Sequence, residues 1–289
     1  MLWHWVHRSV SVVGLAVVLA LAPEAAPPIL RLATTTSTDD SGLLKAILPA
    51  FERTCACRVE VVAVGTGQAL EIGRRGDADV VLVHARAAED QFVADRHARE
   101  RRDVMYNDFV VVGPKADPAR IAGIARARDA FVAIAKTSAS FVSRGDRSGT
   151  DSAEKAIWAS ARLSPAGGVW YHSLGQGMGE TLVTANEMAA YTLADRGTWL
   201  SMRGKLPALQ LLVGGKTLAE NQDPTLRNQY GVMAINPNVH PGVNFPLATR
   251  FVRWLVSPET QQAIGEFGRK EFGQPLFYPS AGNKPATSR

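Results

Sequence analysis

The sequence predicts an α/β protein made of two units, one inserted within the other. Short apolar runs alternate with polar turns and with segments of helical periodicity. This alternation implies parallel strands, because parallel neighbours need crossover connections. Two longer strand segments, "NDFVVVGP" and "NQYGVMAINP", flank a second set of such elements. We expect these two strands to cross between the units, with a ligand cleft where the units face each other.

The chain begins with a segment typical of a secretory leader. His4, His7 and Arg8 precede the apolar run of residues 10–22, and the proline-broken stretch "PEAAPP" follows. The run is short for a membrane span, and its position favours a signal peptide over a core helix. We expect residues 1–26 to be removed and the mature protein to be periplasmic.

The first unit starts with the strand "ILRLA", which leads through "TTTSTDDSG" into a helix over residues 43–54. Leu43, Leu44 and Ile47 give this helix an apolar face, and Pro49 within it is expected to kink or divide the helix. The strands "RVEVVAV" and "ADVVLV" follow, with the turn "VGTGQ" and another helix between them.

The second unit contains the helix "SAEKAIWASARL", the glycine-rich turn "SLGQGMGE", a helix through Met188 and the strand "AAYTLA". An amphipathic helix pair over residues 245–268 returns to the first unit. We therefore assign residues 27–110 and 231–289 to lobe I and residues 111–230 to lobe II.

The formal net charge is +5, from 32 basic and 27 acidic residues. This balance suits an anionic partner. It does not indicate a nucleic-acid partner, because no basic run is interleaved with aromatic side chains.

The two cysteines, Cys55 and Cys57, are separated by a single residue. Export permits a disulfide, yet a bridge across one residue is strained, so a bridged pair and two free thiols both remain open. Two thiols without nearby histidines make a poor metal site. We expect neither a cofactor nor a cation held by protein ligands.

Four turns before helices are rich in hydroxyl side chains or glycine: "TTTSTDDSG", "VGTGQ", "SRGDRSGTDS" and "LGQGMGET". A helix N-terminus leaves N–H groups unpaired and carries partial positive charge, so it suits an anion. Ser, Thr and Asp are also ordinary N-caps, and Asp151 with Glu154 fits a capping box. Several such ends at one cleft would hold an oxyanion without any metal.

The stretch "SRGDRSGT", residues 143–150, adds two arginines that capping does not require. The fixed fork of the Arg144 guanidinium matches an oxyanion, although a surface pair with Asp146 is the alternative. We expect Arg144 to bind an anion and Arg147 to face solvent.

No catalytic motif is complete. "GDRSG" is not the nucleophile elbow, "GTGQAL" lacks the third glycine of a dinucleotide fingerprint, and "VGGKT" lacks the first glycine of a P-loop. An exported hydrolase with Ser148 or a threonine as nucleophile would need His84 or His172 as base. His84 either points into the cleft or simply ends its strand.

Taken together, these segments resemble the TupA-type tungstate-binding family, the periplasmic substrate-binding proteins of ABC transporters. The resemblance rests on "TTTSTDDSGLL", "VGTGQALEIGRRGDADVVLVH", "VMYNDFVVVGP", "SRGDRSGT", "GQGMGETL", "AYTLADRGTWL" and "NQYGVMAINPNVHPGVNF", which cover nearly the whole mature chain. It implies a type II periplasmic binding fold that captures tungstate in the cleft and delivers it to a membrane permease, with no enzymatic activity. We expect a monomer.

The resemblance also implies which residues hold the oxyanion. They are Thr35, Thr36, Ser37, Thr66, Gly67, Ser143, Arg144, Ser148, Gly149, Thr150 and Arg196.

Molybdate and phosphate are the alternative ligands. Phosphate near neutral pH keeps a proton and needs an acceptor carboxylate, whereas tungstate offers only acceptor oxygens. Asp146 or Asp39 facing the ligand would therefore favour phosphate. Molybdate has nearly the same shape and charge as tungstate, so the sequence does not separate the two.

Overall fold

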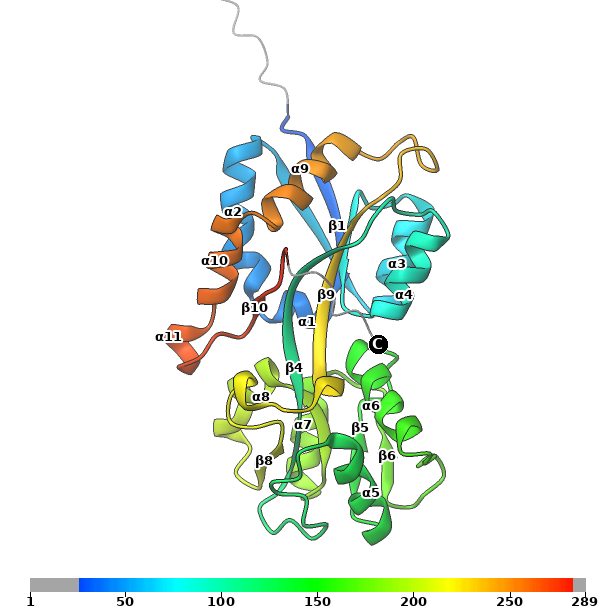
Figure 1. Cartoon of the computed structure of the whole chain (residues 1–289), viewed down its shortest axis with the longest axis vertical. Helices are drawn as coiled ribbons and strands as arrows, with labels where there is room; N and C mark the ends of the chain where they lie inside the picture. The colour runs from blue at the N-terminus through cyan, green and yellow to red at the C-terminus, as the bar shows by residue number, and fades with distance from the viewer. Residues whose placement is uncertain (1–25, 283–289) are drawn as a thin grey trace, which may run out of the picture.

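A computed structural model describes residues 26–282 and divides them between two lobes (Figure 1). The leader predicted over residues 1–26 lies outside the described residues except for its last residue. Within residues 26–282, no helix is both long and apolar enough to cross a membrane.

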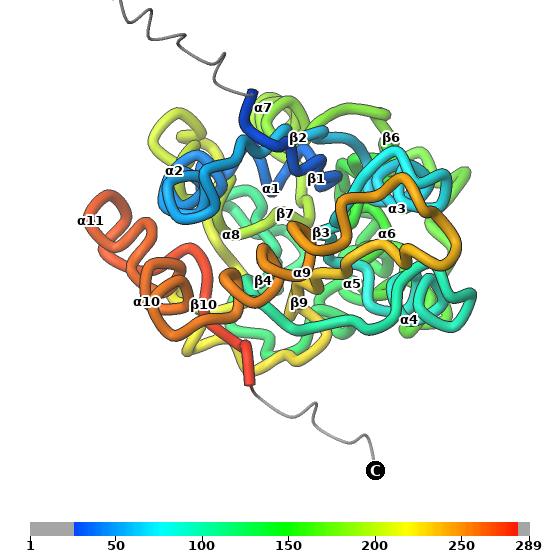
Figure 2. The backbone as a smooth tube through the Cα atoms, turned by 90° about the horizontal axis from the view of Figure 1, so that it is seen from above, coloured from blue at the N-terminus to red at the C-terminus, as the bar shows by residue number. Residues whose placement is uncertain are grey.

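Lobe I is built on the central strand β1, which pairs in parallel with β2 on one side and β3 on the other. Helices cover both faces of this sheet: seen from above, α2, α10 and α11 lie on one side and α3 and α4 on the other (Figure 2). The elements are β1 (Ile29–Thr35), α1 (Thr36–Asp40), α2 (Leu43–Cys55), β2 (Arg58–Val64), α3 (Thr66–Arg75), β3 (Val80–Val83), α4 (Arg86–Ala94), α9 (Phe245–Leu255), α10 (Pro258–Glu266), α11 (Arg269–Phe272) and β10 (Tyr278–Pro279). The predicted parallel pairing is confirmed.

Helix α2 buries the predicted apolar face, including Leu43, Leu44 and Ile47. The helix runs undivided through Pro49, so the expected division is wrong, and Pro49 lies on the exposed side. On that side, water can bond the carbonyl that a proline leaves unpaired.

Two long strands, β4 (Arg102–Pro114) and β9 (Arg227–Ala234), run between the lobes (Figure 1). They pair with each other antiparallel up to the Asp108–Arg227 pair. From Phe109 onwards, β4 pairs with β7 and β8 instead. We therefore propose that the lobes divide near Asp108 and Arg227, a few residues from the boundaries predicted from sequence.

Lobe II surrounds the far half of β4. Its elements are α5 (Ala127–Thr137), β5 (Phe141–Ser143), α6 (Gly149–Ser160), β6 (Tyr171–Ser173), α7 (Met178–Glu187), β7 (Thr192–Asp195), α8 (Arg196–Met202), β8 (Leu209–Val213) and the 3-10 turns η1 (Arg203–Lys205), η2 (Leu218–Glu220) and η3 (Pro224–Leu226). Phe131, Phe141 and Trp158 pack their rings together, with 4.3 Å between the centroids of Phe131 and Trp158. This buried cluster joins α5, β5 and α6, and so fixes the loop between β5 and α6.

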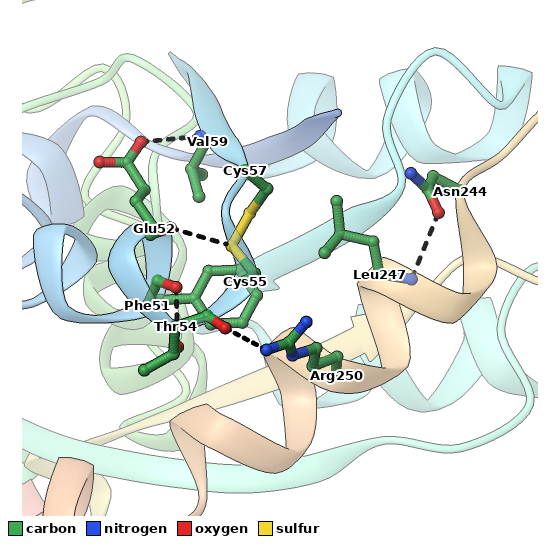
Figure 3. The surroundings of a disulfide bond; sticks show 9 residues. All are labelled: Phe51, Glu52, Thr54, Cys55, Cys57, Val59, Asn244, Leu247 and Arg250. Atoms are coloured by element: carbon green, nitrogen blue, oxygen red, sulfur yellow. Dashed lines mark hydrogen bonds between the residues drawn. A yellow bond between two sulfur atoms is a disulfide. The ribbon is translucent and has the colours of Figure 1, made fainter. Parts of the chain in front are cut away.

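The two cysteines form a disulfide at the corner between α2 and β2 (Figure 3). Of the two open alternatives, the structure has the bridged pair. Two further contacts hold the same corner: Glu52 accepts a hydrogen bond from the backbone N–H of Val59 at 2.8 Å, and Arg250 of α9 donates to the carbonyl of Thr54. The corner lies within lobe I and holds none of the predicted ligand-binding residues.

Candidate functional site

A cleft of about 860 Å³ takes its lining from both lobes and from the crossing strands. The polar residues that line it and bear on the argument are Thr36, Ser37, Asp40 and His84 of lobe I, Asn107, Asn228 and Tyr230 of the crossing strands, and Arg144, Asp146 and Thr150 of lobe II. Of the predicted binding residues, Thr36, Ser37, Arg144 and Thr150 are therefore in the lining.

The lobe I side of the site follows from strand register. Thr35 at the end of β1 lies opposite Val64 at the end of β2, and Thr34 lies opposite Leu82 of β3. The carboxyl ends of parallel strands meet at one sheet edge. The "TTTS" turn, the "GTG" turn and His84 are therefore neighbours at that edge.

Thr35 caps α1, because its Oγ1 accepts the N–H of Thr38 at 3.2 Å. Its side chain is buried, whereas Thr36 and Ser37 face the cleft. Thr35 therefore has the capping role, and Thr36 and Ser37 are the residues of this turn that line the cleft.

Thr66 is the first residue of α3, and Gly67 follows it on the exposed surface. Thr66 is 6% exposed, and its Oγ1 is buried without a hydrogen-bond partner. Neither residue is in the cleft lining. The hydroxyl of Thr66 is nevertheless a buried donor whose hydrogen bond is unsatisfied.

The "SRGDRSGT" loop curls back on itself in front of α6. Gly145 and Arg147 adopt left-handed backbone angles, with φ of 61° and 62°, and Arg147 is exposed as predicted. Arg144 is nearly buried and donates to Asp146 at 2.5 Å. Asp146 also accepts the backbone N–H of Ser148 at 3.1 Å. Asp146 therefore orients Arg144, and each of its two oxygens accepts a hydrogen bond from within the loop.

Burial raises the pKa of Asp146, but the hydrogen bonds from Ser148 and the charge of Arg144 lower it further than burial raises it. The net pKa lies below the usual value, so the carboxylate stays ionised at neutral pH. Asp39 is exposed and outside the lining, whereas its neighbour Asp40 lines the cleft. Burial and the charge of Asp39 raise the pKa of Asp40.

Ser148 is the N-cap of α6 and accepts the N–H of Asp151 at 3.2 Å. The capping interaction thus lies three residues earlier than the predicted pairing of Asp151 with Glu154. Gly149 is the first residue of α6, and a Cβ at this position would overlap the ring of His84. Gly149 is the point where lobe II meets the imidazole of lobe I.

Three of the predicted binding residues carry buried polar atoms without a hydrogen-bond partner: Thr66 Oγ1, Ser143 Oγ and Arg144 Nε. Each such buried group costs about 1–3 kcal/mol when it lacks a partner. All three are groups that can donate. Of the three residues, Arg144 lines the cleft, whereas Thr66 and Ser143 are buried behind the lining.

Arg196 does not lie in the cleft lining. Its Nε and Nη2 each donate to the carboxylate of Asp108 at 2.7 Å, and its Nη1 and Nη2 donate to the carbonyls of Gly215 and Gly214. Arg196 and Asp108 are each 3% exposed. The guanidinium therefore fastens α8 to the crossing strand β4, a contact that the spacing of "ADRGT" does not reveal.

The sequence reasoning missed the polar residues of the crossing strands. Asn107 and Asn228 lie opposite each other in register and are buried. Asn228 Nδ2 donates to Asn107 Oδ1 at 2.7 Å. The sequence did contain a sign of this pair, because the predicted crossing segments "NDFVVVGP" and "NQYGVMAINP" each begin with an asparagine. Among residues 26–282, no group of three or more His, Cys, Asp or Glu side chains is arranged to hold a metal ion.

Known proteins of similar sequence support this architecture. A family model described as a PBP superfamily domain matches residues 22–259. The tungstate-binding protein TupA of Peptoclostridium acidaminophilum is 47% identical over 253 residues, which cover 86% of this chain and 85% of that protein.

The chain belongs to the TupA-type family of the PBP superfamily. The solved structure of TupA from Desulfovibrio alaskensis G20 is 43% identical, with a TM-score of 0.78 over 88% of this chain and 99% of that one. The structure of the tungstate ABC transporter protein from Geobacter sulfurreducens is 48% identical, with a TM-score of 0.72 over 83% and 98%. The TupA-type chain thus has the type II periplasmic binding fold that its sequence predicts.

Replacing Arg196 by alanine should destabilise the protein by about 3–5 kcal/mol, because Asp108 would stay buried without its charged partner. The matched control is Arg86→Ala, whose pair with Asp90 is about half exposed at 49% and 53% and should cost less than about 1 kcal/mol. Urea unfolding followed by circular dichroism measures both. Equal costs would contradict this role for Arg196.

Proposed function

We propose that this chain is the solute-binding protein of an ABC transporter, that it captures tungstate between its lobes, and that it delivers the anion to a membrane permease. The observation that carries the proposal is the set of buried, unpartnered donors in Thr66, Ser143 and Arg144. The names of the TupA relatives point to the same ligand. Removal of residues 1–26 would put this monomeric binding protein in the periplasm.

The ligand-binding set that we propose combines one guanidinium with hydroxyls and helix-end N–H groups. Its members are Thr36, Ser37, Thr66, Gly67, Ser143, Arg144, Ser148, Gly149 and Thr150, with Thr35 as a buried support. We leave Arg196 out, because four of its N–H bonds point to protein acceptors. Charge-assisted bonds from such a set offset the desolvation of a divalent anion.

The hydrogen-bond pairing of Asp146 favours tungstate over phosphate. Each of its oxygens already accepts one hydrogen bond, from Arg144 and from the N–H of Ser148, so the carboxylate is paired within its own loop. Tungstate carries no proton that would need an acceptor, whereas phosphate does. The lining also holds the carboxylates of Asp40, Glu180, Asp195 and Glu271, which keep phosphate as the second candidate.

Two features weigh against the hydrolase alternative. Ser148 uses its Oγ as a helix cap. Burial and the charge of Arg144, partly offset by the hydrogen bond with Asn228, lower the pKa of His84 to about 4. An imidazole with so low a pKa is a weak general base. We therefore propose a binding protein without catalytic activity.

Titration calorimetry of the mature protein should give tight 1:1 binding of tungstate, equal or weaker binding of molybdate, and negligible binding of phosphate and sulfate. The order follows from a site of donors around a proton-free dianion. Phosphate binding tighter than tungstate would mean that a carboxylate of the lining accepts the phosphate proton, and it would overturn the proposal.

Replacing Arg144 by glutamine should weaken tungstate binding by at least about 100-fold, roughly 2.8 kcal/mol, because the one guanidinium in the lining is lost and Asp146 is released. The matched control is Arg147→Gln, which removes the same charge from an exposed position three residues along the same loop. It should change affinity by less than about threefold. Similar losses in both variants would mean that overall charge, and not the Arg144 contact, determines binding.

A further inference from the structure

His84 ends β3 at the lobe I sheet edge, and it is 9% exposed in the cleft lining. Both ring nitrogens have partners: Nδ1 lies 2.9 Å from Asn228 Oδ1, and Nε2 lies 3.2 Å from Thr35 Oγ1 and 3.4 Å from Ser37 Oγ. The face of the ring packs against Tyr230, with 4.7 Å between centroids. These contacts fix the ring from several sides.

The hydrogen-bond chain through the crossing strands determines the tautomer. Asn228 Nδ2 donates to Asn107 Oδ1, so the amide oxygen of Asn228 is the atom that faces the imidazole. An amide oxygen only accepts. Nδ1 of His84 therefore carries the proton, and in the neutral ring Nε2 is left as an acceptor.

The lone pair on Nε2 takes one hydroxyl proton, and the geometry favours that of Thr35. Thr35 is the closer hydroxyl and is buried, whereas Ser37 lines the cleft. Thr35 Oγ1 in turn accepts the N–H of Thr38 and lies 2.6 Å from Thr38 Oγ1. Thr35 Oγ1 also lies 3.2 Å from Ser37 Oγ. Because Nε2 takes the Thr35 proton, Ser37 is not needed as its donor, and the Ser37 proton can turn from Thr35 to a ligand.

We propose that neutral His84 is a positioning residue of the anion site. It takes the proton of Thr35, leaves Ser37 to donate to the anion, and joins both to the crossing strands through Asn228. This proposal rests on the proposed function, and it assigns His84 to neither catalysis nor direct ligand contact. The ring also touches Gly149 of α6, so the same residue couples the hydroxyl arrangement to the position of lobe II.

The hydrogen bond between Thr35 and His84 also bears on the choice between protonated and unprotonated anions. Because Thr35 occupies Nε2, the imidazole offers no lone pair to a protonated anion. The "TTTS" turn thus presents donors to the ligand, as Arg144, held by Asp146, does on the opposite lobe. Loss of the Nε2 acceptor would let the Thr35 and Ser37 hydroxyls rotate, and the turn would then present fewer fixed donors to the anion.

The test compares two variants by tungstate titration. His84→Phe keeps a ring but removes both nitrogens, and it should lower affinity at least tenfold. His84→Gln can place an amide donor near Asn228 and an amide acceptor near Thr35, and it should stay within about threefold of the wild type. Unfolding midpoints of the three proteins check that the fold is retained. Equal affinity of His84→Phe and wild type would overturn the proposal.

A second readout holds even if His84→Phe does not fold. Nitrogen-15 NMR of the wild-type imidazoles at pH 7, without anion, should give a protonated Nδ1 and an unprotonated Nε2 for the histidine signal that His84→Gln lacks. An Nε2–H tautomer or an imidazolium would overturn the proposal. Failure of wild type to bind tungstate would instead overturn the proposed function, while the NMR result would still decide the hydrogen-bond arrangement.

Discussion

The parallel register of β1 with β2 and β3 is the constraint on which the site depends. It places the end of β1 beside the end of β2 and close to the end of β3, and it thereby gathers two hydroxyl-bearing turns and one imidazole at a single sheet edge. A slip of one residue would turn every side chain of a strand to the opposite face. Buried residues such as Leu30, Leu32 and Val80 hold the register, because a slip would expose them.

The electrostatics of the cleft depend on a carboxylate that is paired within its own loop. Asp146 binds Arg144 and the N–H of Ser148, which fixes the guanidinium while its Nε stays without a partner. A second buried pair, Arg196 with Asp108, does comparable work away from the cleft by joining α8 to β4. Two arginines that look alike in sequence thus have different tasks, set by which carboxylate each one meets.

Most of the fold could be predicted from sequence, because apolar periodicity and turn residues carry it directly. The two crossing strands, the parallel pairing and the apolar face of α2 follow from such local patterns. Pro49 was misjudged because its tolerance depends on which side of the helix faces water. The site was harder to predict. Thr36, Ser37, Arg144 and Thr150 do line the cleft, as the sequence predicts, whereas Arg196 has its partners in Asp108 and in the carbonyls of Gly214 and Gly215. Contacts between residues so far apart in the chain, like the pairing of His84 with Asn228, leave no local pattern.

The central claim is that an oxyanion supplies the hydrogen bonds which Thr66, Ser143 and Arg144 lack. The most direct measurement is a crystal structure of the mature protein with tungstate, with the metal located by anomalous scattering at the tungsten edge. The account predicts one tungsten atom in the interlobe cleft, with anion oxygens within hydrogen-bond distance of Thr66 Oγ1, Ser143 Oγ and Arg144 Nε. A tungsten atom elsewhere, or a bound anion that leaves these three atoms unpartnered, would contradict it.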